Sequence, residues 1–385
     1  MAKYEQVAEF VNDVQAEVLG EESLAQWDTS NIVETGKAIT ALDGWQNRLV
    51  PALVNRIGRS IYVDRLYSPS VPTLYVDSWE FGSIMAKFST ELVDAEDNPA
   101  WELTPGASYD MDVFKGMTAK AKFWNKRTTH MIEQSIPDYQ LKDSFRDMTE
   151  MNAFISMIQT HIANSLTIKN EALISATLVH LIASTIYDGQ STQKINLISR
   201  YNTEMGLTGD DALKTADALH TPNFLRFATL EMARWLKRME RYSVKFNVGQ
   251  TQKFTPPERL NGVMLDDFRA AFGTYLYDAS GQFTTEYLSL PKCDTVPYWQ
   301  APDDYSFAKI SKVYDTFESG YSVNQSGVVA VFFDRWGAGV TNFNPRVDSH
   351  YNAKANFTNY WYKREAGYFN DTDENCIVFY MADPA

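Results

Sequence analysis

The longest apolar pattern in the chain is helical. From Leu141 to Leu181, apolar residues recur mainly at spacings of three and four, which places them on one face of a helix. Pro137 stands at a favourable first-turn position and Gly189 at a favourable end. We therefore predict one helix over 137–189. Thirty of its residues alone would span roughly 45 Å, so it is interpreted as a strut.

A shorter helical stripe stands near the N-terminus. Tyr4, Val7 and Val11, followed by two further valines, are three or four residues apart, and Gly20 is placed to end the helix. A stripe of this kind needs a partner surface. It docks either on its own domain or, as an arm, on a neighbouring copy, and the pattern leaves both readings open.

Strand patterns stand on both sides of the long helix. Residues 61–77 read as two β-rich runs, and 327–340 is an apolar strand run followed by a turn at Asn344-Pro345. In 351–385 the runs NYWYKR and CIVFYM are predicted strands, joined by a turn at 370–373. One face of these strands is expected to complete a sheet beneath the long helix. The other face, with Lys363 and Arg364, is expected to meet neighbouring subunits.

Residues 78–136 are predicted to form a long hairpin with an irregular tip. Its first half is acidic, whereas its second half carries most of the Lys and Arg. A basic segment with aromatics, such as 115–130, also fits single-stranded nucleic acid. The net charge of the chain favours pairing with carboxylates of a neighbouring copy instead. The contact residues expected on this hairpin are Trp101, Lys122, Trp124 and Arg127.

Residues 190–326 are typical of a separate α/β subdomain. Thr221-Pro222 resembles a helix start and precedes an amphipathic stretch over 223–242. The segment 260–272 reads as a short strand followed by a helix. Loops are expected around 281–302, where Gly and Pro recur.

Composition narrows the class of protein. The 385 residues are 44% hydrophobic and carry a net charge of −14, which argues against tight binding of nucleic acid phosphates. The high content of Tyr, Trp and Phe suits a core and an interface equally. Two separated cysteines favour a reducing compartment. Neither a signal pattern nor an apolar run long enough to span a membrane is recognised, so the chain is expected to be soluble and intracellular.

The sequence offers little chemistry. The five histidines and two cysteines lack zinc-ligand spacing. Two acidic clusters, beginning at Asp94 and Asp371, resemble calcium loops but lack the glycine and the glutamate that such loops require, so both are interpreted as turns. Nucleotide and nucleophile motifs are missing as well. We therefore expect no catalytic, cofactor or metal site. A hydrolase using carboxylates of 190–326 is retained only as a weak alternative.

The order of these elements resembles that of tailed-bacteriophage major capsid proteins of the Hong Kong 97 type. Residues 327–382, together with 53–70 and 127–157, are similar to segments of capsid proteins from short-tailed phages and siphophages of Gram-positive and gut hosts. The resemblance implies an α+β fold. Its parts would be an N-arm and lead-in (1–58), an E-loop region (59–136), a P-domain spine helix (137–189), an A-domain (190–326) and returning P-domain strands (327–385).

The same resemblance implies a structural protein. Many copies would assemble as hexamers and pentamers into an icosahedral shell around double-stranded DNA, without sequence-specific binding, cofactors or a membrane. Scaffolding, portal and decoration proteins would be partners, and the chain would reside in the virion after assembly in the host bacterial cytoplasm. The shell of an encapsulin-like cellular nanocompartment is the alternative with the same fold.

Overall fold

The computed structural model describes residues 71, 74, 85–90, 97, 102–108, 116, 119–125, 127–137, 148–275, 293–317 and 320–383. The predicted N-terminal helix, with Tyr4, Val7 and Val11, lies outside these residues. The described residues belong to two compact units. The first unit includes Arg127–Leu173 and Thr341–Gly367, and the second includes Ser70–Lys126, Ile174–Val340 and Tyr368–Ala385.

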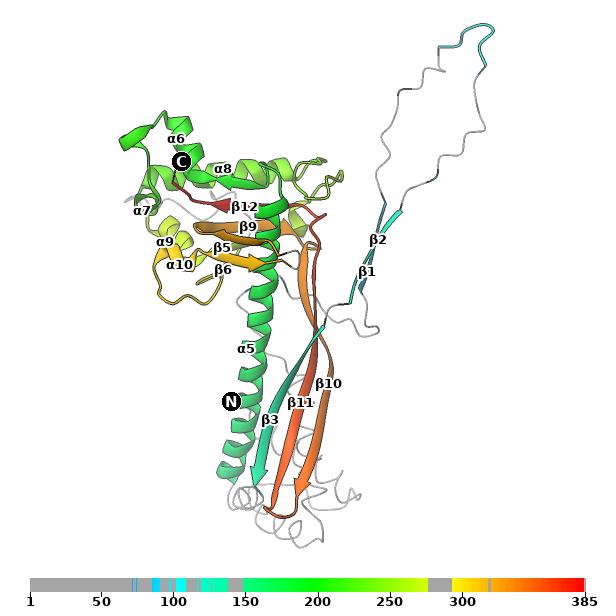
Figure 1. Cartoon of the computed structure of the whole chain (residues 1–385), viewed down its shortest axis with the longest axis vertical. Coiled ribbons are helices and arrows are strands. Elements are labelled where there is room, and N and C mark those ends of the chain that lie inside the picture. The colour runs from blue at the N-terminus through cyan, green and yellow to red at the C-terminus, as the bar shows by residue number, and fades with distance from the viewer. Residues whose placement is uncertain are drawn as a thin grey trace. The chain divides into compact units, whose positions relative to one another are not determined.

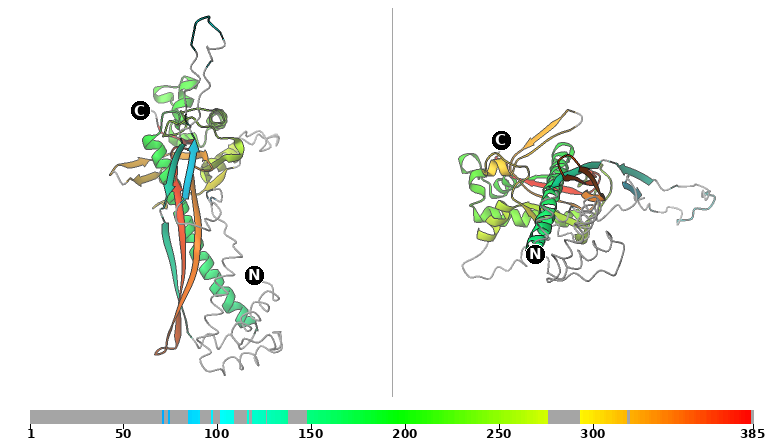
Figure 2. Two further views of the ribbon diagram at one scale, coloured as in Figure 1. Left: turned by 90° about the vertical axis from the view of Figure 1, so that its right-hand side faces the viewer. Right: turned by 90° about the horizontal axis from the view of Figure 1, so that it is seen from below.

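The first unit contains a three-stranded sheet in the order β10-β11-β3 (Figures 1 and 2). Its strands are β3 (Arg127–Pro137), β10 (Ala338–Asn352) and β11 (Phe357–Asn370). β11 pairs antiparallel with β3, from Phe357 opposite Pro137 to Gly367 opposite Arg127. Because side chains alternate along a strand, one face of β11 is buried. Its buried side chains in this unit are Thr358, Tyr360, Tyr362, Arg364 and Ala366.

The sequence predicts a long helix that begins at Pro137, but the structure places this residue in a strand. Pro137 is the last residue of β3 and not the first of a helix, while α5 comprises Met148–Asp188, 41 residues. At 1.5 Å per residue α5 is about 60 Å long. Its end is as predicted, since the N–H of Gly189 donates to the Thr185 carbonyl at 3.0 Å. A Cβ at Gly189 would lie only 2.1 Å from that carbonyl oxygen.

Two further strand predictions need correction. The turn expected at Asn344-Pro345 does not occur, because β10 continues through both residues. β10 is an edge strand, and an edge tolerates a proline that has no N–H to donate. Leu74, expected in a strand, instead donates its N–H to the Val71 carbonyl at 3.3 Å in a short 3-10 turn.

The second unit contains a five-stranded sheet in the order β4-β12-β9-β5-β6 (Figure 1). The β4–β12 and β5–β6 pairs are parallel, and β9 pairs antiparallel with both β12 and β5. Its strands are β4 (Lys194–Asn196), β5 (Leu260–Leu265), β6 (Asp294–Val296), β9 (Val328–Asp334) and β12 (Cys376–Tyr380). The sheet thus joins strands of the expected 190–326 subdomain to strands of the C-terminal segment.

Helices and short hairpins surround this sheet. The predicted helix after Thr221 is confirmed as α8, and the predicted strand and helix over 260–272 are confirmed as β5 and α9. Besides the five-stranded sheet, the unit contains α6 (Leu197–Met205), η3 (Gly209–Asp211), α7 (Thr215–Ala218), α8 (Pro222–Met239), η4 (Pro257–Arg259), α9 (Asp266–Tyr275), α10 (Phe307–Ile310), β7 (Val313–Thr316) and β8 (Ser322–Gln325), among other elements.

The core of the second unit is centred on β9. All seven β9 residues are buried, as expected for a strand with neighbours on both sides and elements on both faces. Gly262 of β5 lies opposite Phe332 of β9. A Cβ at Gly262 would approach the Phe332 ring to 2.6 Å, so glycine is required for this close packing.

One described stretch has the length and composition of a membrane span. It is Thr160–Asp188 of α5, and 44% of its most apolar window is buried inside the protein. Leu178, Leu181 and Ile182 are almost fully buried within the second unit. Core helices of soluble proteins commonly show the same composition.

Candidate subunit-interaction site on the β1–β2 ribbon

Two antiparallel strands of the second unit, β1 (Met85–Thr90) and β2 (Ala119–Trp124), form a ribbon. Lys87 lies directly opposite Lys122 in the register. Like charges in directly opposite positions destabilise a strand pair. The ribbon therefore requires anions close to these two ammonium groups.

An acidic turn supplies those anions. The residues between β11 and β12, 371–375, form the turn that the sequence predicts. Lys122 Nζ lies 2.7 Å from Asp371 Oδ1 and 2.6 Å from Asp373 Oδ2. Lys87 Nζ lies 2.5 Å from Asp371 Oδ2 and also contacts Glu374. Lys253 completes the group at 2.7 Å from Glu374 Oε1.

These three lysines and three carboxylates, Lys87, Lys122, Lys253, Asp371, Asp373 and Glu374, are called the lysine–carboxylate cluster below. The two signs balance within it, so acidic residues that resemble part of a calcium loop are neutralised by ammonium groups. Among the described residues, the structure contains no group of three or more His, Cys, Asp or Glu side chains arranged to hold a metal ion.

Burial and ion pairing act against each other in the cluster. Burial disfavours the ionised carboxylate of Asp371, but the ammonium groups of Lys122 and Lys87 outweigh burial and lower the pKa of Asp371 below its usual value. Burial likewise disfavours the charged Lys122, yet hydrogen bonds to Asp371 and Asp373 raise the pKa of Lys122. Both groups are therefore charged across the neutral pH range.

The backbone fixes the acidic turn. The Asp371 N–H donates to the Gly337 carbonyl at 2.7 Å, and Asp371 Oδ1 accepts the N–H of Asp373 at 3.1 Å. Gly249 packs closely against the turn, because a Cβ there would lie 2.2 Å from Asp373 Oδ1.

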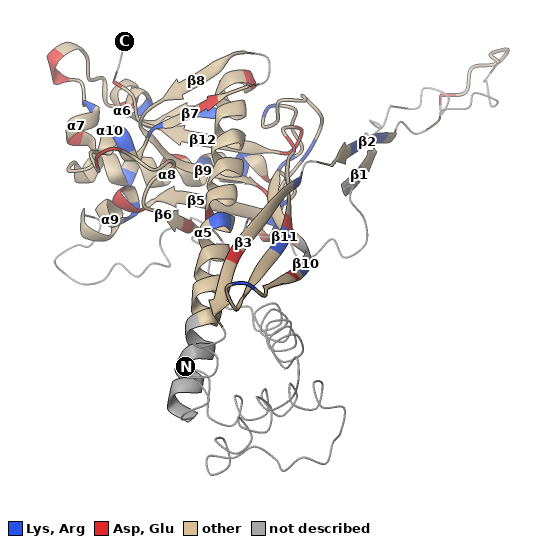
Figure 3. Cartoon of the chain, turned by 60° about the horizontal axis from the view of Figure 1, so that its bottom comes forward, with Lys and Arg blue, Asp and Glu red and all other residues tan. Residues whose placement is uncertain are grey.

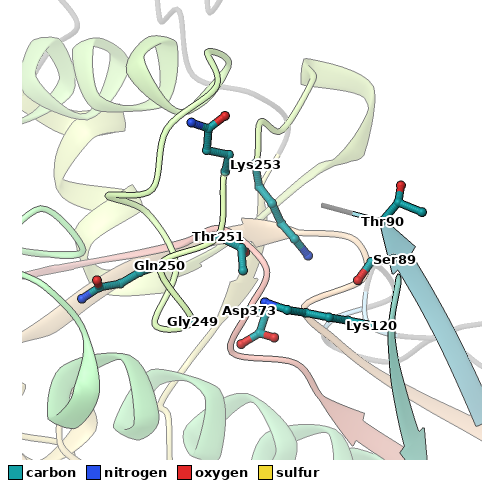
Figure 4. Close-up of a pocket in the computed structure, with 9 residues that line it drawn as sticks. Ser89, Thr90, Lys120, Gly249, Gln250, Thr251, Lys253 and Asp373 are labelled. Atoms are coloured by element: carbon teal, nitrogen blue, oxygen red, sulfur yellow. The ribbon is translucent and has the colours of Figure 1, made fainter. Parts of the chain in front are cut away.

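A polar hollow adjoins the cluster. It has a volume of about 270 Å³ and is lined by Ser89, Thr90, Lys120, 249–253 and Asp373. Figure 4 shows Lys120 and Lys253 extending toward this hollow from different elements. The ribbon therefore meets the body of its unit through polar and charged groups.

Trp124 anchors the end of the ribbon. Its Nε1 donates to the Asn370 carbonyl at 3.2 Å, and its ring lies 5.7 Å from the Phe369 ring, centroid to centroid. Asn370 Nδ2 in turn donates to the Thr177 carbonyl of α5 at 3.2 Å. Trp124 thereby connects β2 to the end of β11.

The opposite face of the ribbon is apolar and exposed. By strand alternation, Phe88 and Phe123 point away from the face that carries Lys87 and Lys122. Their exposed fractions are 73% and 63%, and their rings make an edge-to-face contact at 6.2 Å. Sequence reasoning did not single out Phe88, although its two-residue alternation with Ala86 and Thr90 places it on the face opposite Lys87.

The structure brings together some of the predicted contact residues. Lys122 and Trp124 lie in the site, whereas Trp101 is outside the described residues. Within the chain, Lys122 pairs with the carboxylates of Asp371 and Asp373, and its contact with a neighbouring copy stays a prediction. Arg127 is in the first unit, on β3, where it pairs with Glu365 at 3.0 Å.

The sequence predicts that Lys363 and Arg364 lie on the same outward face, but the structure places them on different faces. They are consecutive residues of β11, so their side chains point to opposite faces. Lys363 pairs with Asp348 at 2.8 Å, while Arg364 is only 7% exposed. Lys363 stays a predicted contact residue, and Arg364 is buried within its own unit.

Comparisons with known proteins agree with the fold. A family model described as Phi29-like phage major capsid protein matches residues 11–380. A chain of the capsid structure of Staphylococcus phage Andhra is 11% identical, with a TM-score of 0.50 over 80% of this chain and 83% of that one. A chain from the structure of the head fiber and inner core protein gp22 of bacteriophage P68 is 8% identical, with a TM-score of 0.50 over 81% and 84%.

No curated protein sequence matches the chain. The fold is the α+β Hong Kong 97-like capsid fold, and the comparisons give no support to a nanocompartment shell or a hydrolase. The chain belongs to the Phi29-like phage major capsid protein family and is a structural protein of the virion shell, not an enzyme.

Proposed function

We propose that this chain builds an icosahedral shell of hexamers and pentamers around double-stranded DNA, and that the apolar face of the β1–β2 ribbon lies on a neighbouring copy. One observation carries the proposal for the ribbon. Its charged face is held by the lysine–carboxylate cluster, while its other face exposes Phe88 and Phe123.

The energetics support a contact made by many copies. An isolated two-stranded ribbon is marginally stable in water. Covering the exposed parts of Phe88 and Phe123 would contribute roughly 2–4 kcal/mol per copy, taking about 1.5–3 kcal/mol for a fully buried side chain. A closed symmetric shell repeats such a contact around the whole particle, so that modest contacts add up.

A double substitution tests the ribbon contact. In Phe88→Ser/Phe123→Ser, the lysine–carboxylate cluster is unchanged, so the subunit should stay folded and soluble but should form few or no shells by electron microscopy. Tyr305→Ser is the matched control, since Tyr305 is 79% exposed on the same unit. Shells of normal yield and size from the double variant would refute the ribbon contact.

The finer assignments follow from the same function. Scaffolding, portal and decoration proteins are proposed as partners, and assembly is proposed to take place in the host bacterial cytoplasm. The acidic net charge of −14 supports a shell that encloses DNA without sequence-specific binding. Cryo-electron microscopy of particles purified from infected cells would test these assignments, and particles without DNA at every stage would contradict them.

A further inference from the structure

Lys and Arg recur along α8 and just beyond its end, in a chain whose net charge is −14; Figure 3 marks these residue types on the ribbon. Residues 222–245 contain six Lys or Arg and only two Glu. Helical spacing puts the exposed α8 residues on one side of the helix. This surface, called the α8 face, consists of Arg226, Leu230, Arg234, Lys237 and Arg238, with Arg241, Tyr242 and Lys245 just beyond the helix.

The α8 face also has the composition of a protein interface. Leu230 is 48% exposed between two arginines, and Tyr242 is 57% exposed with its ring 4.6 Å from that of Phe254. Arg238 is held in place by stacking on Trp235 at 4.5 Å. Arginine and aromatic residues are enriched in interfaces, and an arginine that is already ordered loses less entropy on binding.

Only part of this positive charge is neutralised within the chain. Arg234 pairs with Glu231, and Lys237 pairs with Glu240. Within the described part of the chain, the structure gives no ion pair to Arg226, Arg238, Arg241 or Lys245. Four cations of the α8 face are thus available to an acidic partner.

A complementary surface lies elsewhere on the same unit. The segment 204–217 carries four exposed carboxylates, and in the portion of the chain that is described none of them has an ion pair. They are Glu204, Asp210, Asp211 and Asp217. A hollow of about 440 Å³ between the end of α6 and η3 is lined by Asn202, Gly206, Leu207, Gly209 and Ala212, among others. Met205, 51% exposed, stands in the chain between Glu204 and the lining residue Gly206. We call this surface the α6–η3 hollow.

We propose that the α8 face of one copy docks onto the α6–η3 hollow of the next copy. The proposal rests on the shell function above, because it requires many copies in contact. The two surfaces are different, so the contact is heterologous and can close a ring of subunits. DNA phosphates would also attract the arginines, but they offer nothing to Leu230 and Tyr242. The apolar residues therefore favour a second copy over DNA.

Charge exchange tests the contact. Arg226→Glu/Arg241→Glu and, separately, Asp210→Arg/Asp211→Arg should each raise the apparent critical concentration of assembly at least about tenfold, because like charges would then meet at the interface. Combining both pairs in one chain should restore it to within about threefold of the unsubstituted protein. Lys309→Glu/Lys354→Glu, at exposed sites outside both surfaces, controls for the change in net charge.

A disulfide trap supplies an independent readout. A chain carrying both Met205→Cys and Leu230→Cys should give a ladder of oligomers on a non-reducing gel after oxidation of assembled shells. Each single substitution should give only monomers. If the α8 faces of two copies met each other instead, Leu230→Cys alone would give dimers. That result would overturn the proposal.

The outcomes separate this inference from the shell function. If the unsubstituted protein forms shells but neither charge reversal affects assembly, the α8 contact is wrong and the shell function stands. Failure of the combined variant to recover would also overturn the contact, provided that each variant keeps the unsubstituted unfolding midpoint. Normal shells from Arg226→Glu/Arg241→Glu that no longer retain DNA would assign the α8 face to DNA instead.

Discussion

Replacing Asp371 with asparagine should release the β1–β2 ribbon from the body of its unit. The Asp371 side chain is 1% exposed and contacts both Lys87 and Lys122. Asparagine has nearly the same shape and keeps an oxygen to accept the Asp373 N–H, so the acidic turn should persist. What is lost is the negative charge shared by two lysines that face each other across the strand pair.

The cost lies between two limits. Removing one partner of a fully buried ion pair costs about 3–5 kcal/mol, whereas an exposed pair contributes about 0.2–1 kcal/mol. Lys87 is 18% exposed and Lys122 is 38% exposed, and each keeps one carboxylate, Glu374 or Asp373. We therefore expect a loss of about 2 kcal/mol in the free energy of ribbon docking, by interpolation between those limits.

Hydrogen exchange measures this loss directly. With about 1.4 kcal/mol per factor of ten, amides of β1 and β2 should exchange about thirtyfold faster in unassembled Asp371→Asn, while those of β9 should be unchanged. Asp348→Asn is the control, because Asp348 pairs with Lys363 on the first unit. Ribbon exchange within threefold of the unsubstituted protein, or an equal acceleration in β9, would refute the reasoning.

Four further predictions concern the same unit. The pKa of Asp371 is lowered in the folded protein, so its contribution to ribbon docking is complete above the ordinary aspartate pKa of about 3.9. That contribution is lost as the pH falls through the lower folded pKa. The fluorescence difference between the unsubstituted protein and Trp124→Phe should therefore change only below pH ~4. The Lys122 contribution has the opposite sign. It is complete below 10.5 and is lost as the pH rises through the raised pKa, so docking should survive at pH ~10. Gly262→Ala should lower the free energy of unfolding by about 2 kcal/mol in denaturant titrations, because the new Cβ overpacks against Phe332; an unchanged midpoint would contradict this. Trp124→Ala should leave the subunit soluble but reduce shell yield, since it removes the bond to Asn370; normal yield on electron micrographs would argue against that role.

The sequence predicts the interior elements well. β9 is a continuous apolar run, α8 begins after Thr221-Pro222, and β12 stands in a short β-prone run near the C-terminus. In each case burial dictates residue type, so the pattern is readable without the structure. The two proline errors share a cause: Pro137 is the last residue of β3 and Pro345 lies within β10, and both strands are at the edges of their sheet, where a residue without an N–H to donate is tolerated.

The candidate site was harder to predict. Lys87 and Asp371 are 284 residues apart in sequence, and nothing in the local pattern of either residue indicates the other. The acidic turn was recognised as a turn, but its partners were not, because ion pairs between distant segments leave no periodic signal. Local composition alone identified Trp124 and Lys122 as contact residues. The structure places both beside the same turn.

The register of the β1–β2 ribbon has a consequence for the fidelity of folding. In the observed pairing, both lysines share one face and both phenylalanines share the other. A slip of one residue would put one lysine and one phenylalanine on each face. Such a ribbon would neither satisfy the acidic turn nor offer a complete apolar surface. A mispaired subunit is therefore poorly suited to join a growing shell. The positions of these four side chains distinguish a correctly paired ribbon from a mispaired one.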